Sequence, residues 1–442
     1  MEGRVTVLGG GFAGVEAAWA AAQRGVRVRL IEMRPETMTP AHKTGLLCEL
    51  VCSNSFKSSL PDSPSGELKA EMEMLGSLVI PVARHFAVPA GEALAVDREL
   101  FAEEITRRIE AHPLIEVERR EAVEVPADRP LVIATGPLTS DRLGEAIGRL
   151  TGRQHLYFYD AVSPTVEASS LDHSVVFPQS RYDKSGGDYL NCPLNEEQYE
   201  AFVDALLAAE QVPLHDFEQP HYFEGCLPIE EIARRGRRSL AFGNFKPVGL
   251  TNPGSSERLY AVVQLRPENL DKTLYSLVGC QTRMKWGEQR RVFRMIPGLE
   301  QAEFVRYGVI HRNTYLDSPR LLFPTLQYRR DDGLYFAGQL VGVEGYIESA
   351  AAGIVAGINA SRTLFGHGPV TPPRETMIGA LLDYVATCPA KDFAPMNANW
   401  GLLPDPEPPI RDKQQRRLAK LAVAREAMRR FVREDLREGC DG

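Results

Sequence analysis

The chain has 442 residues, enough for two or three domains, and its 43% hydrophobic and 25% charged residues are typical of a globular protein. We expect no signal peptide, because a buried strand is predicted within five residues of Met1, and no membrane span, because no apolar run approaches the required length of roughly 20 residues. Seven scattered cysteines predict a reducing, cytoplasmic location, and a net charge of −8 argues against a protein wrapped wholly around nucleic acid.

The first 32 residues predict a dinucleotide-binding unit. A strand at residues 5–8 leads into a GxGxxG loop, an Ala-rich helix at 15–24 and a second strand at 26–31. The glycines allow a tight turn, close approach of a pyrophosphate and close packing of helix on strand, and the helix N-terminus favours phosphate. An acid after the second strand is placed to bind a ribose hydroxyl. The predicted binding residues are Gly9, Gly10, Gly11, Phe12, Ala13, Gly14 and Glu32.

Two cysteines follow this unit, Cys48 and Cys52, four residues apart. On a helix they would share a face. A zinc site would need a second ligand pair, which the sequence lacks, so we predict no metal. A redox disulfide of the flavin reductase type would require a second GxGxxG, which is also missing. We therefore favour a single working thiol, Cys52, in a polar loop, with Cys48 as apolar filler.

The next elements complete the first part of a cofactor domain. The pattern predicts a helix at 97–109, a short strand at 115–118 and a buried strand at 130–137 that contains Thr135 and Gly136. In two-dinucleotide flavoproteins such a strand closes the first cofactor domain with its glycine near the cofactor. After the opening fingerprint, this strand favours FAD over NAD.

Residues 194–325 differ in sequence pattern from the segments before them and lack a nucleotide-binding fingerprint, so we predict an inserted α+β substrate domain. A helix is expected at 196–210 and a strand at 259–265. Between them lies Cys226, in a turn made by Gly225 and Pro228. A buried structural cysteine is the ordinary alternative for this position, but turns carry chemistry more often than cores do.

A second Gly-rich element follows the insert. A strand at 333–338 leads into a loop and an Ala/Gly helix that ends near residue 363, with its small residues and N-terminus expected against a flavin. Together with residues 1–32 it predicts a discontinuous FAD domain. A basic helix is expected at 413–436. The cofactor-binding residues predicted in the second element are Gly338, Gln339, Gly345 and Tyr346.

Basic residues are concentrated in two regions of this acidic chain. Residues 232–294 contain thirteen Lys or Arg against four Asp or Glu, and residues 411–430 contain eight against two. Each region alone is consistent with a solvated helix face. Because there are two such regions, binding of an anionic macromolecule is an equally open interpretation of these basic residues.

Three runs, at 49–55, 224–230 and 337–350, resemble one family: the folate- and FAD-dependent tRNA (uracil-5-)-methyltransferases, TrmFO, related to the GidA flavoproteins. The resemblance implies methylation of the T-loop uridine of tRNA, position 54, at C5. The carbon would come from 5,10-methylenetetrahydrofolate and the electrons from NAD(P)H through FAD. A GidA-like wobble-uridine modification enzyme and a small-molecule flavin oxidoreductase remain the alternatives.

The resemblance also assigns roles. Cys226 is expected to attack uracil C6, because a thiolate is the soft nucleophile that activates C5, and Cys52 is expected to be a supporting thiol near the flavin. The oligomeric state is left open. The predicted fold is α/β, with a Rossmann-like FAD-binding domain of the two-dinucleotide flavoprotein type at 1–193 and 326–442 and the inserted domain between its parts. The residues expected to bind RNA are Arg234, Arg235, Arg237, Arg238, Lys285, Arg290, Arg291, Arg416 and Arg417.

Overall fold

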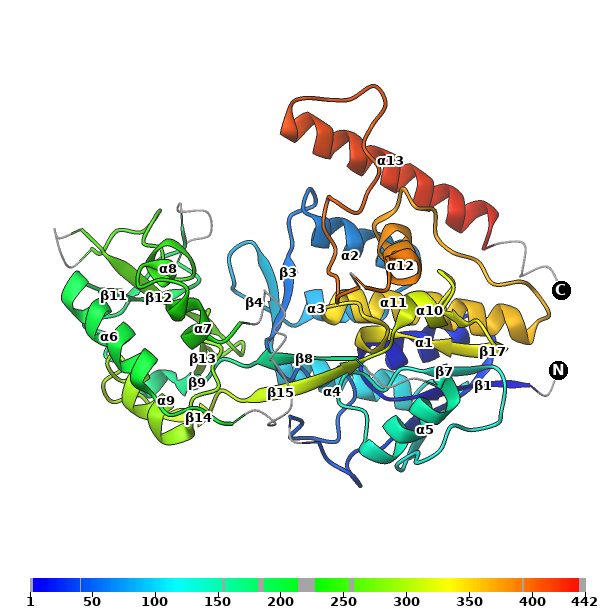
Figure 1. Ribbon diagram of the computed structural model, residues 1–442, viewed down its shortest axis with the longest axis horizontal. Helices are drawn as coiled ribbons and strands as arrows, with labels where there is room; N and C mark the ends of the chain where they lie inside the picture. Colours follow the sequence, from blue (N-terminus) through cyan, green and yellow to red (C-terminus); the bar gives the residue numbers. More distant parts are fainter. Residues whose placement is uncertain are drawn as a thin grey trace.

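The computed structural model describes residues 3–39, 41–152, 156–181, 187–213, 227–253, 258–391 and 393–436, with only the backbone described at 156–160, 311 and 312. Figure 1 shows a larger and a smaller body joined by two long neighbouring strands. The first strand and the last helix both belong to the larger body. The chain therefore leaves the larger body once and returns to it.

The larger body is built on a six-stranded sheet, of which five neighbouring strands run parallel. Val5, Val7, Leu30 and Val132 in these strands are fully buried. Such near-continuous apolar strands are required when helices cover both faces of a parallel sheet. In spatial order the strands are β16 (Gln327–Tyr328), which is antiparallel, β17 (Asp331–Phe336), β7 (Leu131–Ile133), β1 (Arg4–Leu8), β2 (Arg27–Glu32) and β6 (Ile115–Arg119).

Two helices pack tightly against each other over this sheet, α1 (Phe12–Ala22) and α11 (Tyr346–Leu364). A Cβ atom added to Gly353 would lie 2.1 Å from the carbonyl oxygen of Ala13, and one added to Gly357 would lie 2.3 Å from that of Ala17. The small residues of α11 therefore serve its approach to α1, whereas the sequence had suggested approach to the flavin. This contact places the N-terminus of α11 beside the first Gly-rich loop.

Other elements surround this core. Figure 1 shows α5 on the side of the sheet opposite α1 and α11, and α13 lying across α2 and α12. A small sheet of β3, β5 and β4 carries the segment that follows Cys52. The bounds are β3 (Ser55–Ser58), α2 (Pro64–Met74), α3 (Val79–His85), β4 (Ala87–Val88), β5 (Ala93–Val96), α4 (Arg98–Glu110), α5 (Asp141–Thr151), α10 (Ser318–Leu321), η4 (Gly338–Val341), α12 (Met377–Thr387) and α13 (Lys413–Glu434).

The smaller body has its own antiparallel sheet and hydrophobic core. Phe202, Phe245 and Phe293 are fully buried in that core and pack on one another. In spatial order the strands are β10 (Phe177–Pro178), β11 (Leu190–Leu194), β12 (Ala261–Pro267), β13 (Leu274–Leu277), β9 (Thr165–Glu167) and β14 (Phe304–Arg306). The helices are η1 (Ala168–Ser170), α6 (Glu196–Ala208), α7 (Ile229–Arg234), α8 (Ser239–Phe242) and α9 (Trp286–Phe293).

The two bodies are joined by β8 (Leu156–Ala161) and β15 (Ile310–Tyr315), which pair antiparallel from Ala161 with Ile310 to Leu156 with Tyr315. The sheet of the smaller body already contains β9, β10 and β11, which all begin before residue 194. We therefore propose that the inserted domain begins and ends at this strand pair, near residues 161 and 310, in place of the expected 194 and 325.

The predicted fold class is confirmed: strands from before and after the insert share one parallel sheet. The predicted helices and strands also occur, with small shifts at their ends, since α1 begins at Phe12 and α4 ends at Glu110. Across the described ranges, no helix combines the length and apolar composition of a membrane-spanning segment.

We predict that Gly357→Ala destabilises the protein even though alanine is the better helix former by about 1 kcal/mol. The added methyl group must push α11 away from the Ala17 carbonyl, and overpacking of this kind costs about 1–3 kcal/mol. Denaturant unfolding followed by circular dichroism measures the change. Gly368→Ala is the control, because a Cβ there meets no atom within 4 Å; equal unfolding midpoints for the two variants would contradict the prediction.

Candidate active site

Parallel strands β1, β7 and β17 end at one edge of the sheet and deliver three Gly-containing loops to it. A cavity of about 120 Å³ lies along this edge. Ten of the thirteen residues predicted to bind the cofactor line it: Gly9, Gly11, Phe12, Ala13, Glu32, Thr135, Gly136, Gly338, Gln339 and Tyr346. A smaller cavity of about 40 Å³ continues past Gly9, Glu32 and Thr135. The edge therefore forms one extended crevice, as a dinucleotide requires.

The glycines of the first loop have distinct roles. Gly9 has a φ of +98°, and a Cβ there would lie 2.5 Å from the Ala134 carbonyl oxygen. A Cβ on Gly14 would lie 1.7 Å from the Gly9 carbonyl oxygen, so this position is required by the turn itself. A Cβ on Gly11 would meet no protein atom within 4 Å, although Gly11 lines the crevice at the start of α1. This open space beside helical N–H groups fits the pyrophosphate of FAD.

Glu32 is buried and already holds the loop together. Its carboxylate accepts hydrogen bonds from the N–H of Gly10 at 2.5 Å and from the N–H and Nε of Arg34 at 2.9 and 2.8 Å. Burial opposes ionisation, but Arg34 and these N–H groups lower the pKa of Glu32. A carboxylate has about four acceptor positions, so one remains for the predicted ribose hydroxyl.

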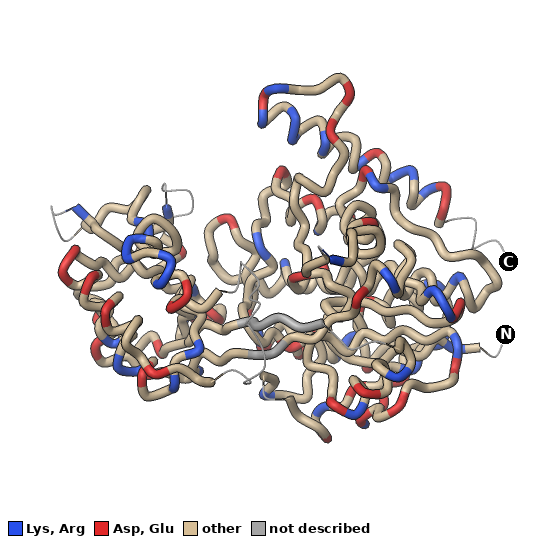
Figure 2. The backbone as a smooth tube through the Cα atoms, viewed as in Figure 1, with Lys and Arg blue, Asp and Glu red and all other residues tan. Residues whose placement is uncertain are grey.

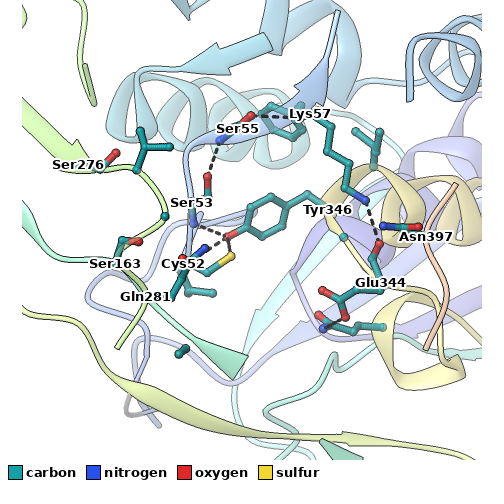
Figure 3. Close-up of a pocket in the computed structure, with 18 of the residues that line it drawn as sticks. Cys52, Ser53, Ser55, Lys57, Ser163, Ser276, Gln281, Glu344, Tyr346 and Asn397 are labelled. Carbon is teal, nitrogen blue, oxygen red and sulfur yellow. Dashed lines mark hydrogen bonds between the residues drawn. The ribbon is translucent and has the colours of Figure 1, made fainter. Parts of the chain in front are cut away.

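A larger cavity of about 380 Å³ shares Pro137, Leu138, Gln339 and Tyr346 with the crevice. Cys52 lies in its wall, and Figure 3 shows the Tyr346 ring reaching across toward Cys52. The rest of the wall comes from both bodies of the protein. The smaller body contributes Arg266, Glu268, Ser276, Leu277, Val278, Gly279 and Gln281. A second substrate could therefore reach the crevice from the side of the inserted domain.

Tyr346 and Cys52 are in direct contact. The Tyr346 hydroxyl lies 2.9 Å from the backbone N of Cys52 and 2.9 Å from its Sγ. The N–H can only donate, so the hydroxyl oxygen accepts from it and its hydrogen is available for the sulfur. Burial and the nearby Cys52 raise the pKa of Tyr346 well above its usual value, which keeps this hydrogen in place.

Lys57 ties the Cys52 segment to the second Gly-rich loop, and the sequence analysis missed it. Its Nζ donates to the buried Glu348 carboxylate at 2.6 Å and to the Glu344 carbonyl oxygen at 3.1 Å. A Cβ on Gly345 would lie 2.3 Å from Glu348 and 2.7 Å from Lys57 Nζ. Gly345 is thus required by this ion pair, although it also lines the larger cavity. No local sequence pattern marks a pair 291 residues apart.

Cys226 lies outside the described residues, and the chain resumes at Leu227. The segment that follows it is anchored at the cavity wall. The N–H of Ile229 donates to the carbonyl oxygen of Gln281 at 2.7 Å, and Gln281 lines the cavity. The buried Glu230 accepts the Thr282 hydroxyl and the N–H of Arg283 at 3.1 Å.

The structure separates the predicted RNA-binding residues into two groups. On the inserted domain Arg234 pairs with Glu231, Arg237 with Glu200 and Asp204, Lys285 with Glu210, and Arg291 with Glu288. Arg238 lies over Phe242, which is 76% exposed, and Arg290 donates to the Tyr307 hydroxyl at 2.8 Å. Figure 2 shows acidic and basic residues interspersed there.

Helix α13 differs from the inserted domain in its charge pairing. Among the described residues, no carboxylate forms an ion pair with Arg416, Arg417 or Arg430. Figure 2 shows basic residues along this helix. It is held on the larger body by Arg425, whose Nε donates to the buried Glu67 at 2.9 Å. The C-terminal helix is therefore the stronger candidate for binding an anion.

The two cysteines after the first unit do not share a helical face, because residues 44–54 form no helix. Cys48 is buried with a φ of +52°, and burial raises the pKa of its thiol well above the usual value. The interpretation of Cys48 as filler fits this environment. In the part of the chain that the structure describes, no cluster of three His, Cys, Asp or Glu side chains could hold a metal ion.

Comparison with known proteins identifies close relatives. A family model described as glucose inhibited division protein A matches residues 4–367. The methylenetetrahydrofolate–tRNA-(uracil-5-)-methyltransferase TrmFO of Heliobacterium modesticaldum is 55% identical over 432 residues, which is 98% of each chain. TrmFO of Geobacter sulfurreducens is 56% identical, over 96% of this chain and 98% of its own. GidA of Aquifex aeolicus, in its form II crystal, has a similar fold, with a TM-score of 0.69 at 18% identity over 98% of this chain and 75% of its own.

We predict that Gly11→Val abolishes bound flavin while the protein stays folded, because the new side chain occupies only the open space of the crevice. Absorbance near 450 nm per protein, together with the melting temperature, measures both effects. Gly287→Val on the inserted domain, where a Cβ also meets nothing within 4 Å, is the control. Full flavin content in the Gly11 variant would show that the cofactor lies elsewhere.

Proposed function

Because the chain belongs to the glucose inhibited division protein A family and, within it, to the methylenetetrahydrofolate–tRNA-(uracil-5-)-methyltransferases TrmFO, we propose that it methylates a tRNA uridine at C5. The carbon comes from 5,10-methylenetetrahydrofolate and the cofactor is FAD. The T-loop position 54, NAD(P)H as the reductant and a cytoplasmic location complete the proposal. The observation that carries it is the larger cavity, which adjoins the dinucleotide crevice and is lined by Cys52 and Gln281. Gln281 accepts a hydrogen bond from Ile229, in the segment that follows Cys226.

The chain's own residues bind and orient the reactants. The first Gly-rich loop and the N-terminus of α1 hold the pyrophosphate of FAD, and Glu32 holds a ribose. When bound, FAD supplies the hydride that turns the one-carbon unit into a methyl group. The larger cavity, open to the inserted domain, receives the folate and the uracil. The uracil must first be extruded from folded tRNA.

We assign Cys226 to covalent activation of the uracil. Its thiolate adds to C6, and the electron pair moves through C5 to the C4 oxygen. C5 then bonds to the methylene carbon and loses its proton, and the bond from that carbon to the folate nitrogen breaks, which releases tetrahydrofolate. Reduction of the resulting exocyclic methylene to a methyl group expels the thiolate and restores the C5–C6 double bond. The support is positional: Ile229, three residues after Cys226, is bonded to Gln281 in the cavity wall.

Cys52 is assigned a different step, as a supporting thiol at the flavin side of the cavity. It contacts Tyr346, which lines both the cavity and the crevice. The wobble-uridine alternative is not favoured, because the likeness to GidA structures stands at 18% identity and carries the fold alone. A small-molecule flavin oxidoreductase is likewise not favoured by relatives that are 53–56% identical over nearly the whole chain.

The proposal is tested by incubating the holoenzyme with unmodified tRNA, methylenetetrahydrofolate and NAD(P)H, then digesting the RNA and searching for 5-methyluridine by mass spectrometry. We predict product with the wild type and a loss of at least about a hundredfold with Cys226→Ala or Cys52→Ala, at unchanged tRNA affinity. Cys388→Ala, a thiol outside the cavity, is the control. Wild-type enzyme without product would refute the function.

The division of roles is tested with tRNA that carries 5-fluorouridine. Its C5 fluorine cannot leave as a proton, so the thioether at C6 should accumulate. We predict an adduct in the wild type and in Cys52→Ala, mapped by peptide mass to Cys226, and none in Cys226→Ala. An adduct on Cys52 would reverse the assignment while leaving the overall reaction intact.

We predict that tRNA binding depends mainly on α13. Each phosphate contact contributes about −0.7 to −0.9 to the slope of log K against log salt, so Arg416→Ala with Arg417→Ala should flatten the slope by roughly 1.4–1.8. Arg237→Ala with Arg291→Ala should change it less, because acidic neighbours already neutralise both side chains. Fluorescence anisotropy at several salt concentrations gives the slopes. A larger effect of the second pair would place the RNA on the inserted domain.

A further inference from the structure

Three arginines from distant parts of the chain converge behind Cys52. They are Arg98 at the start of α4, Arg266 in β12 and Arg306 at the end of β14. All three surround one buried carboxylate, Glu268: Arg98 forms hydrogen bonds with it, Arg306 Nη2 lies 3.7 Å from its Oε2, and Arg266 is two residues away in the chain. Three positive charges thus face one negative charge.

The cluster is in contact with the Cys52 segment. Arg98 Nη1 donates to the Leu50 carbonyl oxygen at 2.5 Å, and Arg266 Nη2 donates to the Ser53 hydroxyl at 2.9 Å. The negative charge of a Cys52 thiolate favours the charged forms of Arg98, Arg266 and Arg306. Because Coulomb attraction is mutual, each guanidinium favours the thiolate in turn. Arg266 Nε and Arg306 Nε have no hydrogen-bond partner among the described residues.

We propose that Arg98, Arg266 and Arg306, together with the hydroxyl of Tyr346, act as positioning residues that hold Cys52 as a thiolate at neutral pH. The cations supply the compensating charge, and the Tyr346 hydrogen is donated to the sulfur across 2.9 Å. The proton of the thiol passes to solvent. This inference rests on the proposed function in one respect, the catalytic role assigned to Cys52. It adds an electrostatic role for the three arginines and Tyr346.

The charges of the three arginines and Glu268 sum to a net positive charge. Although burial opposes it, the neighbouring guanidiniums lower the pKa of Glu268 to about 2, so its single negative charge is present at neutral pH. Burial and the charge of Arg98 lower the pKa of Arg306 to about 10, which still leaves it charged at neutral pH. Two positive charges therefore remain uncompensated beside Cys52 if the sulfur is neutral.

The other charged groups around the cavity have hydrogen-bond partners outside the cluster. Lys57 is bound to Glu348 at 2.6 Å, and Glu344 accepts from Gln339 at 2.7 Å. On the far side of the cluster, Glu49 is bound to Arg34, and Tyr189 and Lys43 add no negative charge at neutral pH. Glu268 is the one carboxylate, among the described residues, that forms an ion pair with an arginine of this cluster, and Glu344 is a second carboxylate on the cavity wall.

The test measures the ionisation of Cys52 directly. The FAD-loaded protein is treated with iodoacetamide between pH 5.5 and 9.5, and the alkylation rate of Cys52 is followed in its peptide by mass spectrometry. An ordinary cysteine gives a midpoint near pH 8.5. We expect a lower midpoint for the wild type, and for Arg266→Met and Tyr346→Phe a rate at pH 6.5 that is lower by roughly tenfold, the loss for a one-unit rise in pKa.

Two variants distinguish charge from packing. Arg266→Lys keeps the positive charge and should keep the low midpoint, whereas Glu268→Gln removes the opposing charge and should alkylate at least as fast as the wild type. Arg129→Met, at an ion pair with Asp331 near the opposite end of β7, is the control and should leave the profile unchanged. Flavin content and melting temperature confirm folding, and Tyr346→Phe removes a single oxygen if Arg266→Met fails to fold.

A wild-type midpoint near 8.5 would overturn the inference, and so would an unchanged profile in Tyr346→Phe together with Arg266→Met. Alkylation needs neither tRNA nor folate. An enzyme that makes no 5-methyluridine but shows the low midpoint would refute the proposed function and leave the thiolate in place. The reverse result would keep the function and remove the electrostatic role.

Discussion

The contact between α1 and α11 is the constraint on which the rest of the structure depends. Gly353 and Gly357 let the two helices approach until backbone touches backbone, because any side chain there would strike the carbonyls of Ala13 and Ala17. The approach brings the N-terminus of α11, with Tyr346, onto the loop that begins α1. Two segments more than three hundred residues apart thus form a single cofactor crevice.

The inserted domain lies next to the crevice that α1 and α11 form. β8 and β15 hold it beside the open end of the crevice, so that its residues close the larger cavity opposite Cys52 and Tyr346. Gln281 serves twice, as a wall of this cavity and as the hydrogen-bond partner of Ile229. A substrate that enters the larger cavity from the side of the inserted domain therefore reaches the crevice of the larger body.

Charged side chains are paired differently on the surface of the protein and in its interior. The basic stretch of the inserted domain is largely neutralised by acidic neighbours such as Glu200 and Glu210, while α13 keeps several cations without an ion pair in the described chain. In the interior, positive charge exceeds negative charge, because three guanidiniums surround the single carboxylate of Glu268. Counting charges along the chain predicts neither result, since both depend on which side chains face one another.

The sequence by itself determined the strand-loop-helix unit at residues 4–32, the three Gly-containing loops and the two cysteine motifs, because each depends on residues close together in the chain. Only the tertiary structure decided that Gly345 serves the Lys57–Glu348 pair and that the small residues of α11 serve its packing on α1. The same holds for the gathering of Arg98, Arg266 and Arg306 around Glu268, beside the segment that contains Cys52. Each of these depends on contacts between residues far apart in the chain. Such contacts follow from the packing of helices on the sheet and of one body against the other, and no local periodicity or spacing records them.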